Sequence, residues 1–213
     1  MTAAYLRDPK AIYAESFATI EREADLSAFD ADGRALAIRL IHACGMVDIT
    51  NDLVITEDCL AAGRAALARG APIFCDATMV QQGIIRRGRL RDTDVVCPLT
   101  APDVAARAEH AGTTRSAAAV ELWRPRIESA IVAIGNAPTA LFHLLERLAD
   151  GWPKPACILA FPVGFVGAAE SKAALIEANL DIPFATLRGR RGGSALAAAA
   201  VNALGLGLDG DGR

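Results

Sequence analysis

The sequence predicts a three-layer α/β/α fold built on a largely parallel, five-stranded sheet with a flavodoxin-like arrangement. Two observations carry this prediction. Short apolar runs, typical of strands buried on both faces, alternate with helical patterns over most of the chain. In addition, right-handed crossovers between parallel strands place such helices on both faces of one sheet.

The stretch 129–148, SAIVAIGNAPTALFHLLERL, shows the repeating unit most clearly. Its apolar run at 131–134 suits a buried strand, and Gly135 and Asn136 then interrupt the run with turn chemistry. Pro138 fits a first helical position because it has no amide hydrogen to lose there. The loop therefore lies at the carboxyl end of a strand, where helix amino termini offer backbone donors to ligands.

Three helices are expected before the first strand. Asp30 or Asp32 is placed to cap the second helix and Thr56 to cap the third, because their side-chain oxygens accept backbone hydrogen bonds at helix starts. Gly45 and Gly70 suit the left-handed positions that end these two helices. The first helix is predicted to end near residue 25, the second to cover 34–44 and the third 56–69.

Strands and helices alternate over the rest of the chain. The expected strands are 72–76, 94–99, 130–134, 155–161 and 183–187. The expected helices are 78–84, 114–127, 138–149, 168–179 and 194–204. One continuous pattern indicates a single domain over 1–213, and residues 205–213 are expected to form a flexible tail.

The composition narrows the classes of partner. A formal net charge of -3 argues against general attraction to nucleic acid or to anionic membranes, because both are themselves negative. The longest apolar stretch, 156–169, falls short of the roughly 20 residues that a spanning helix needs. The first residues lack the apolar core of a secretory signal. We therefore expect a cytoplasmic protein that binds neither nucleic acid nor membrane.

The cysteine and histidine pattern favours free thiols and no metal. The five cysteines are scattered without a Cys-x-x-Cys pair, and the three histidines are far apart in the sequence. The chain also lacks a Gly-x-Gly-x-x-Gly after its first expected strand and a Walker loop. We therefore expect no metal site and no cofactor. The cysteines are Cys44, Cys59, Cys75, Cys97 and Cys157, and the histidines are His42, His110 and His143.

Two glycine-containing loops follow the last two expected strands. Arg190, Arg191, Gly192 and Gly193 combine guanidinium groups, permissive glycines and a helix start, and Arg188 comes just before them. This loop is either an anion cradle or a solvated turn. The other loop, 162–167, contains Gly164 and is too apolar for an ordinary exposed loop, so it is either a ligand wall or packed core.

Arg39 and His42 are three residues apart on the second expected helix and so project from neighbouring points of one surface. Arg39 is placed to hold an anion beside the imidazole. The helix end before Gly45 would favour the charged form of His42, and so a proton-donating role, whereas Arg39 opposes it. A single titratable side chain is a weak signal, and a core or surface histidine is the simpler interpretation of the residues alone.

Two further segments carry hydroxyl or basic side chains. Thr114 and Arg115 begin a helix, where they either meet an anion or serve as an ordinary cap. Arginines also cluster in 86–91, which is either a lid over a polyanion or a solvated face.

Six segments together resemble the precorrin-8X methylmutase family, also called precorrin isomerase, over nearly the whole chain. These segments are IHACG at 41–45, CDATMVQQGI at 75–84, TRS at 114–116, AIGNAPTALF at 133–142, FPVGFVGAAESK at 161–172 and RGRRGGSA at 188–195. Their joint occurrence in this order is far more specific than any one glycine-rich loop.

The resemblance implies an isomerase of cobalamin biosynthesis that moves a methyl group from C11 to C12 of precorrin-8X and forms hydrogenobyrinate without a redox cofactor. It implies that His42 is the catalytic acid, that Ser16 and Arg39 belong to the substrate pocket, and that the protein is a homodimer with active sites near the interface. Two alternatives stay open: a noncatalytic tetrapyrrole carrier, and the same isomerisation on cobalt-precorrin-8. The predicted substrate-binding residues are Ser16, Arg39, Thr114, Arg115, Asn136, Gly164, Arg188, Arg190, Arg191, Gly192 and Gly193.

Overall fold

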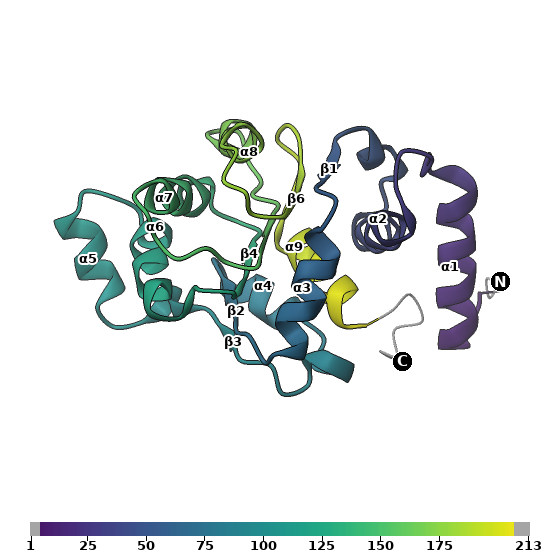
Figure 1. The fold of residues 1–213 in the computed structure, drawn as a ribbon. Helices are drawn as coiled ribbons and strands as arrows, with labels where there is room; N and C mark the ends of the chain where they lie inside the picture. Colours follow the sequence, from purple (N-terminus) through teal and green to yellow (C-terminus); the bar gives the residue numbers. More distant parts are fainter. Residues whose placement is uncertain (1–4, 207–213) are drawn as a thin grey trace.

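The computed structural model of the chain describes residues 5–206 (Figure 1). The helices in this part are α1 (Pro9–Glu23), α2 (Ala31–Cys44), α3 (Cys59–Ala68), α4 (Thr78–Gly83), α5 (Val104–His110), α6 (Arg115–Val120), α7 (Pro138–Ala149), α8 (Ala168–Glu177) and α9 (Ser194–Gly205). The strands are β1 (Leu53–Ile55), β2 (Ile73–Cys75), β3 (Val95–Val96), β4 (Ile131–Ile134), β5 (Cys157–Ala160) and β6 (Phe184–Leu187). The 3₁₀ turns are η1 (Val47–Asn51), η2 (Gly88–Leu90), η3 (Pro98–Thr100) and η4 (Glu121–Arg126).

The strands form one sheet in the order β1-β6-β5-β4-β2-β3. Strands β2 to β6 pair in parallel, and β1 runs antiparallel to its neighbour β6. If β2 is counted as the first parallel strand, the parallel strands lie in the order 2-1-3-4-5, which is the order of flavodoxin-like sheets. From β2 the chain passes to β3 on one side and then to β4 on the other, so the switch point of the strand order lies between β2 and β4. The predicted α/β class and the largely parallel sheet are confirmed.

The number of strands was predicted wrongly, since the sheet of the described residues has six strands and not five. The additional strand is β1, an apolar run of only three residues at the edge of the sheet. Thr56 does not cap α3, which begins later, at Cys59. Its hydroxyl instead accepts the backbone N–H of Phe184 at 2.8 Å and so continues the pairing of β1 with β6.

The structure also changes the predicted helices. The segment predicted as one helix over 114–127 is α6 followed by the 3₁₀ turn η4, which contains Pro125. Helix α5, in a short alanine-rich segment, was not predicted. Asp30 rather than Asp32 caps α2, because the side chain of Asp30 accepts the N–H of Gly33 at 2.7 Å.

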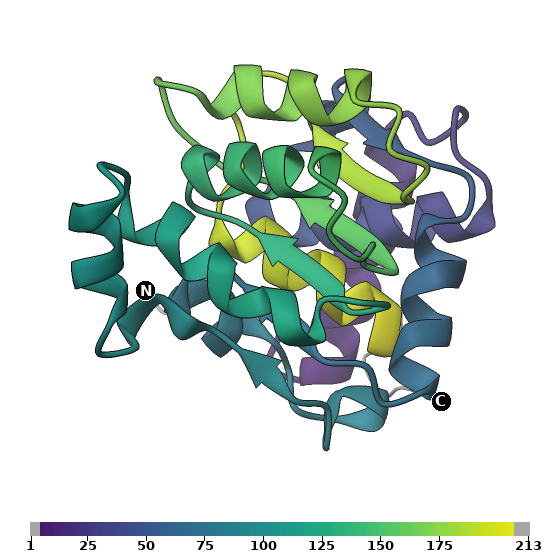
Figure 2. The same ribbon diagram turned by 60° about the vertical axis from the view of Figure 1, so that its left-hand side comes forward.

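The core lies on both faces of the sheet, because successive strand residues point to opposite sides. Ile73 and Ile131 pack on one side with α2, α3, α4 and α9, while Phe74 and Val132 pack on the other with α6, α7 and α8. Figure 2 shows α7 and α8 on the near face and α9 behind the strands. Helices α1 and α5 lie at opposite ends of the molecule (Figure 1).

The end of the described chain packs into the core. Gly205 and Leu206, the first two residues of the predicted tail, are buried, and residues 207–213 lie outside the described part. The apolar stretch 156–169 forms β5, the loop after it and the start of α8. Within 5–206, no helix combines the length and the apolar character that crossing a membrane requires.

Candidate active site

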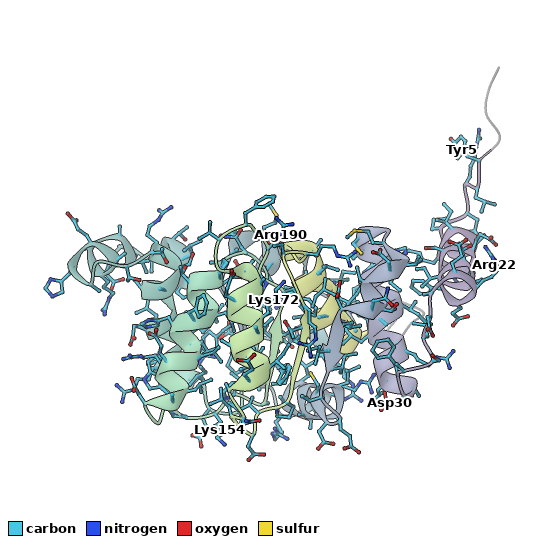
Figure 3. The ribbon with its side chains drawn as sticks, turned by 90° about the horizontal axis from the view of Figure 1, so that it is seen from above. Tyr5, Arg22, Asp30, Lys154, Lys172 and Arg190 are labelled. Carbon is cyan, nitrogen blue, oxygen red and sulfur yellow. The ribbon has the colours of Figure 1, made fainter. Side chains whose placement is uncertain are left out.

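The candidate residues gather mainly at the edge of the sheet where the parallel strands end. Arg190, which follows β6, lies at this edge in Figure 3, whereas Lys154 and Asp30 mark the opposite edge. The loops after β2, β4, β5 and β6 all begin here. This is the edge at which open α/β sheets bind ligands.

His42 and Ser16 form a pair where α1 packs on α2. The Ser16 hydroxyl oxygen lies 2.8 Å from His42 Nδ1. His42 stands in the last turn of α2, which ends as predicted at Gly45 with the left-handed φ of 71°. The pair borders a pocket of about 280 Å³ that is also lined by Ile20, Ile41 and other residues of the two helices.

Two aromatic rings hold the imidazole from the side of α1. The ring centroids of Tyr13 and Phe17 lie 5.3 Å and 5.2 Å from that of His42. Sequence reasoning did not assign these rings to the site. Their spacing of four residues, with Ser16 between them, was the available signal, because it places all three side chains toward one side of α1.

The electrostatics of His42 differ from the expectation that the helix end favours its charged form. Burial of the ring lowers the pKa of His42, and repulsion from Arg39 lowers it further. The imidazole is therefore more readily neutral than that of an ordinary histidine.

Arg39 is buried, with 8% of its surface exposed. Its Nη2 donates a hydrogen bond of 3.1 Å to the carbonyl oxygen of Leu206, at the end of α9. In this single chain the guanidinium thus tethers the end of α9 and acts on His42 through its charge.

The loops after β5 and β6 pack against each other as one unit, which we call the double loop (162–167 and 188–193). The amide of Gly164 donates to the carbonyl of Arg190 at 3.2 Å, and that of Gly193 donates to the carbonyl of Phe161 at 2.7 Å. A side chain at Gly192 would overlap the carbonyl oxygens of Phe161 and Pro162, so this close approach requires glycine.

The tip of the double loop is apolar and exposed. Phe165 and Val166 are 86% and 89% exposed, which rules out packed core for this part of the loop. The Arg190 guanidinium lies 5.2 Å from the centre of the Phe165 ring, within the range of a cation–π contact. The tip therefore presents apolar surface and positive charge together.

Arg191 differs from its neighbours because it is held by two carboxylates. Its Nη1 and Nη2 lie 2.7 Å from oxygens of Asp48 and Asp52, in and just after η1. Arg188 and Arg190 are exposed. The loop 188–193 is thus bound to the segment that follows α2, and its other two arginines face solvent.

A buried carboxylate occupies the point where the strand order switches. Asp76, after β2, accepts hydrogen bonds of 2.7–2.9 Å from the amides of Gly135, Asn136 and Ala137. Burial raises the pKa of Asp76, while the three amide donors act in the opposite direction. The amide donors that a ligand would use in this loop are therefore taken, and the side chain of Asn136 is left exposed.

Thr114 and Arg115 lie beside the same switch point. Thr114 caps α6 as predicted, because its Oγ1 accepts the N–H of Ala117 at 3.2 Å. The same hydroxyl lies 2.8 Å from that of Thr139 in the first turn of α7, and Arg115 is exposed. Thr114 thus contacts α7, which begins two residues after Asn136. The basic segment 86–91 instead precedes β3, the outermost strand next to β2.

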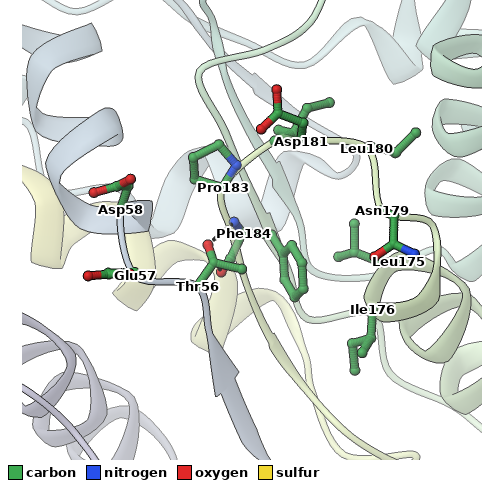
Figure 4. Close-up of a pocket in the computed structure, with 11 residues that line it drawn as sticks. Thr56, Glu57, Asp58, Leu175, Ile176, Asn179, Leu180, Asp181, Pro183 and Phe184 are labelled. Atoms are coloured by element: carbon green, nitrogen blue, oxygen red, sulfur yellow. Dashed lines mark hydrogen bonds between the residues drawn. The ribbon is translucent and has the colours of Figure 1, made fainter.

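A further pocket lies at the opposite edge, between the end of α8 and the start of β6 (Figure 4). It has a volume of about 330 Å³ and is lined by residues such as Thr56, Leu175 and Phe184. None of the predicted site residues lines it.

The chain matches the family described as CbiC, precorrin-8X methylmutase, over residues 11–206. A precorrin-8X methylmutase of Pseudomonas aeruginosa is 58% identical over 94% of this chain and 96% of its own length. The chain belongs to the precorrin-8X methylmutase family. A cobalt-precorrin-8 methylmutase of Priestia megaterium is 34% identical over 92% of this chain and 87% of its own.

The solved structure of a precorrin-8X methyl mutase from Thermus thermophilus has the same fold. It superposes with a TM-score of 0.83 at 38% identity, covering 92% of this chain and 94% of that one. In this member of the precorrin-8X methylmutase family, the matched range includes the His42 and Ser16 pair, the switch point and the double loop.

Proposed function

We propose that this chain moves the methyl group of precorrin-8X from C11 to C12 and so forms hydrogenobyrinate, in cobalamin biosynthesis. The observation that carries the proposal is the pairing of His42 with Ser16 in a chain that belongs to the precorrin-8X methylmutase family. The reaction is an intramolecular migration without net oxidation or reduction, so the chemistry itself asks for no redox cofactor. We place it in the cytoplasm.

His42 is the proposed general acid. Its Nδ1 faces Ser16, so we assign Nε2 as the atom that delivers the proton to the macrocycle. Protonation allows the methyl group to shift by a formal 1,5-sigmatropic route, and loss of a proton then completes the product. The substrate's carboxylates would raise the lowered pKa of His42 on binding and so favour the imidazolium when it is needed.

The remaining candidate residues suit a flat, polyanionic ligand. Three exposed arginines, Arg188 and Arg190 after β6 and Arg115 at the start of α6, are proposed to bind acetate and propionate carboxylates, for which guanidinium is the preferred partner. Phe165 and Val166 are proposed to cover the apolar macrocycle. The side chains of Thr114 and Asn136 and the backbone of Gly164 are proposed to make further polar contacts with the same ligand.

The comparisons favour a metal-free substrate. A relative named for precorrin-8X is 58% identical to this chain, whereas relatives named for cobalt-precorrin-8 are 32% to 36% identical. We therefore propose precorrin-8X rather than its cobalt form as the natural substrate.

We also propose a homodimer that completes the site. The pocket beside His42 holds about 280 Å³, which is too small for a corrinoid with its carboxylate arms. Leu6, Ile12 and Tyr13 are 43% exposed or more and lie in or just before α1, which carries Ser16. A second copy packed on α1 would bury these side chains and enclose the ligand.

Incubation of the purified protein with precorrin-8X, in the presence of a chelator, tests the proposed function. Conversion to hydrogenobyrinate, seen as a changed absorption spectrum and confirmed by NMR of the migrated methyl group, would support it. Pigment that stays bound but chemically unchanged would instead support a tetrapyrrole carrier. A parallel incubation with cobalt-precorrin-8 tests the metal preference through the ratio of the two kcat/KM values.

A further inference from the structure

Lys172 is fully buried on α8, although it lies near the edge that carries the candidate site (Figure 3). Its Nζ donates a hydrogen bond of 2.6 Å to the carbonyl oxygen of Arg191. The Asp52 carboxylate attracts the ammonium, and the same carboxylate accepts a hydrogen bond of 2.7 Å from Nη2 of Arg191. Packing alone would need only the hydrocarbon stem, whereas the ammonium adds a donor aimed at one carbonyl of the double loop.

The contacts of Arg191 show what this donor fixes. The side chain of Arg191 is held by Asp48 and Asp52, and its backbone carbonyl is held by Lys172, so both parts of the residue are fixed. The exposed residues Arg188 and Arg190 lie on the N-terminal side of this anchored point. The loop therefore combines a fixed base with two exposed guanidinium groups.

We propose that Lys172 is a positioning residue for the substrate carboxylates: its ammonium holds the loop 188–193 in the conformation in which Arg188 and Arg190 face the ligand. The inference rests on the proposed role of this loop in binding the corrinoid. Arg191 is then an anchor of the loop, and the substrate's charge is met by its two neighbours.

The charge on Lys172 matters for this role. A charge-assisted hydrogen bond is roughly twice as strong as a neutral one, so the ammonium holds the carbonyl more firmly than the amine. Burial lowers the pKa of Lys172 to about 8, while Asp52 opposes the shift. The loop is therefore held most firmly below about pH 8, and affinity for an anionic corrinoid should fall as the pH rises through that value.

Lys172→Met, which keeps the volume of the stem and removes the donor, tests the proposal. Lys154→Met is the matched control, because Lys154 is exposed at the opposite edge. We expect Lys172→Met to raise the Kd for hydrogenobyrinate and the KM for precorrin-8X about 10-fold, with kcat within about 3-fold of wild type. The wild-type Kd should rise between about pH 7 and pH 9.5, whereas that of the variant should stay flat.

Wild-type affinity and an unchanged pH dependence in Lys172→Met would overturn the inference. If this variant fails to fold, the wild-type series decides, because a Kd that is constant over the same pH range is incompatible with the proposal. Failure of the wild type to convert precorrin-8X would count against the proposed function. Conversion with a pH-independent Kd would count against Lys172 alone.

Discussion

The hydroxyl oxygen of Ser16 lies 2.8 Å from Nδ1 of His42, across the contact between α1 and α2. With Tyr13 and Phe17 against the ring, this bond fixes the plane of the imidazole and leaves Nε2 as the nitrogen that we propose faces the ligand. Helix α1 thus belongs to the candidate site although it packs at the end of the molecule, outside the layers of the sheet.

Ser16→Ala should lower kcat about 10-fold, a modest share of the roughly 10² to 10⁴ that a positioned general acid supplies. The acid is still present in this variant, but its orientation is less well fixed. Thr19→Ala is the matched control, because Thr19 lines the same pocket and its hydroxyl lies 3.5 Å from Glu15. Equal kcat values for the two variants in steady-state kinetics would contradict the proposed role of Ser16 in orienting His42.

The pH profiles of kcat/KM and of kcat should differ. Burial and Arg39 lower the pKa of His42 in the free enzyme below its ordinary value of 6.5. As the pH rises, the free enzyme therefore loses the protonated form of His42 at a lower pH than an ordinary histidine would. We expect the carboxylates of bound substrate to raise this pKa again. Because kcat/KM reports the free enzyme and kcat the complex, the falling limb of kcat should lie at higher pH. Coincident limbs would show that substrate charge does not tune His42.

Asp76→Asn should lower the free energy of unfolding by about 2 to 4 kcal/mol, because a buried carboxylate that accepts three backbone amides is replaced by a group that also presents donors. Asp103→Asn is the control, since Asp103 is exposed, lies just before α5 and forms an ion pair with Arg107 of that helix. Urea unfolding of both variants is the measurement. Equal unfolding midpoints for the two variants would mean that Asp76 does not stabilise the loop after β4.

Ile12→Glu should shift the protein from dimer to monomer, because a charge would be placed in the apolar surface of α1 that we assign to the subunit interface. Ile85→Glu is the matched control, since Ile85 is another exposed isoleucine, located after α4. Sedimentation at micromolar concentration should show twice the chain mass for wild type and control alone. A monomeric wild type with full activity would contradict the proposal that a dimer completes the site.

The parallel part of the fold was predictable because its strands are buried on both faces and read as apolar runs between helical patterns. Strand β1 was not, because its three residues pair with β6 about 130 positions later, and such a distant antiparallel contact leaves no local pattern. The same contact takes Thr56 away from its predicted role as a helix cap.

The candidate site was predictable as a set of residues more than as a set of roles. The resemblance named His42, Ser16 and Arg39, but only the packing of α1 and α9 shows that the first two meet and that the third is buried against Leu206. A substitution of Arg39 should therefore also cost stability. Likewise, the anchoring of Arg191 depends on carboxylates about 140 residues earlier, which local patterns cannot reveal.

Whether His42 is the general acid is tested by the single-turnover rate of His42→Ala with precorrin-8X, measured beside the melting temperature of the variant and its affinity for hydrogenobyrinate. We expect a folded, dimeric variant that binds the corrinoid and whose rate of methyl migration is lower by a factor of about 10² to 10⁴. His42→Asn should be similarly slow if a proton, and not a hydrogen bond alone, is required. A folded His42→Ala protein with nearly normal turnover would contradict the assignment of His42 as the acid.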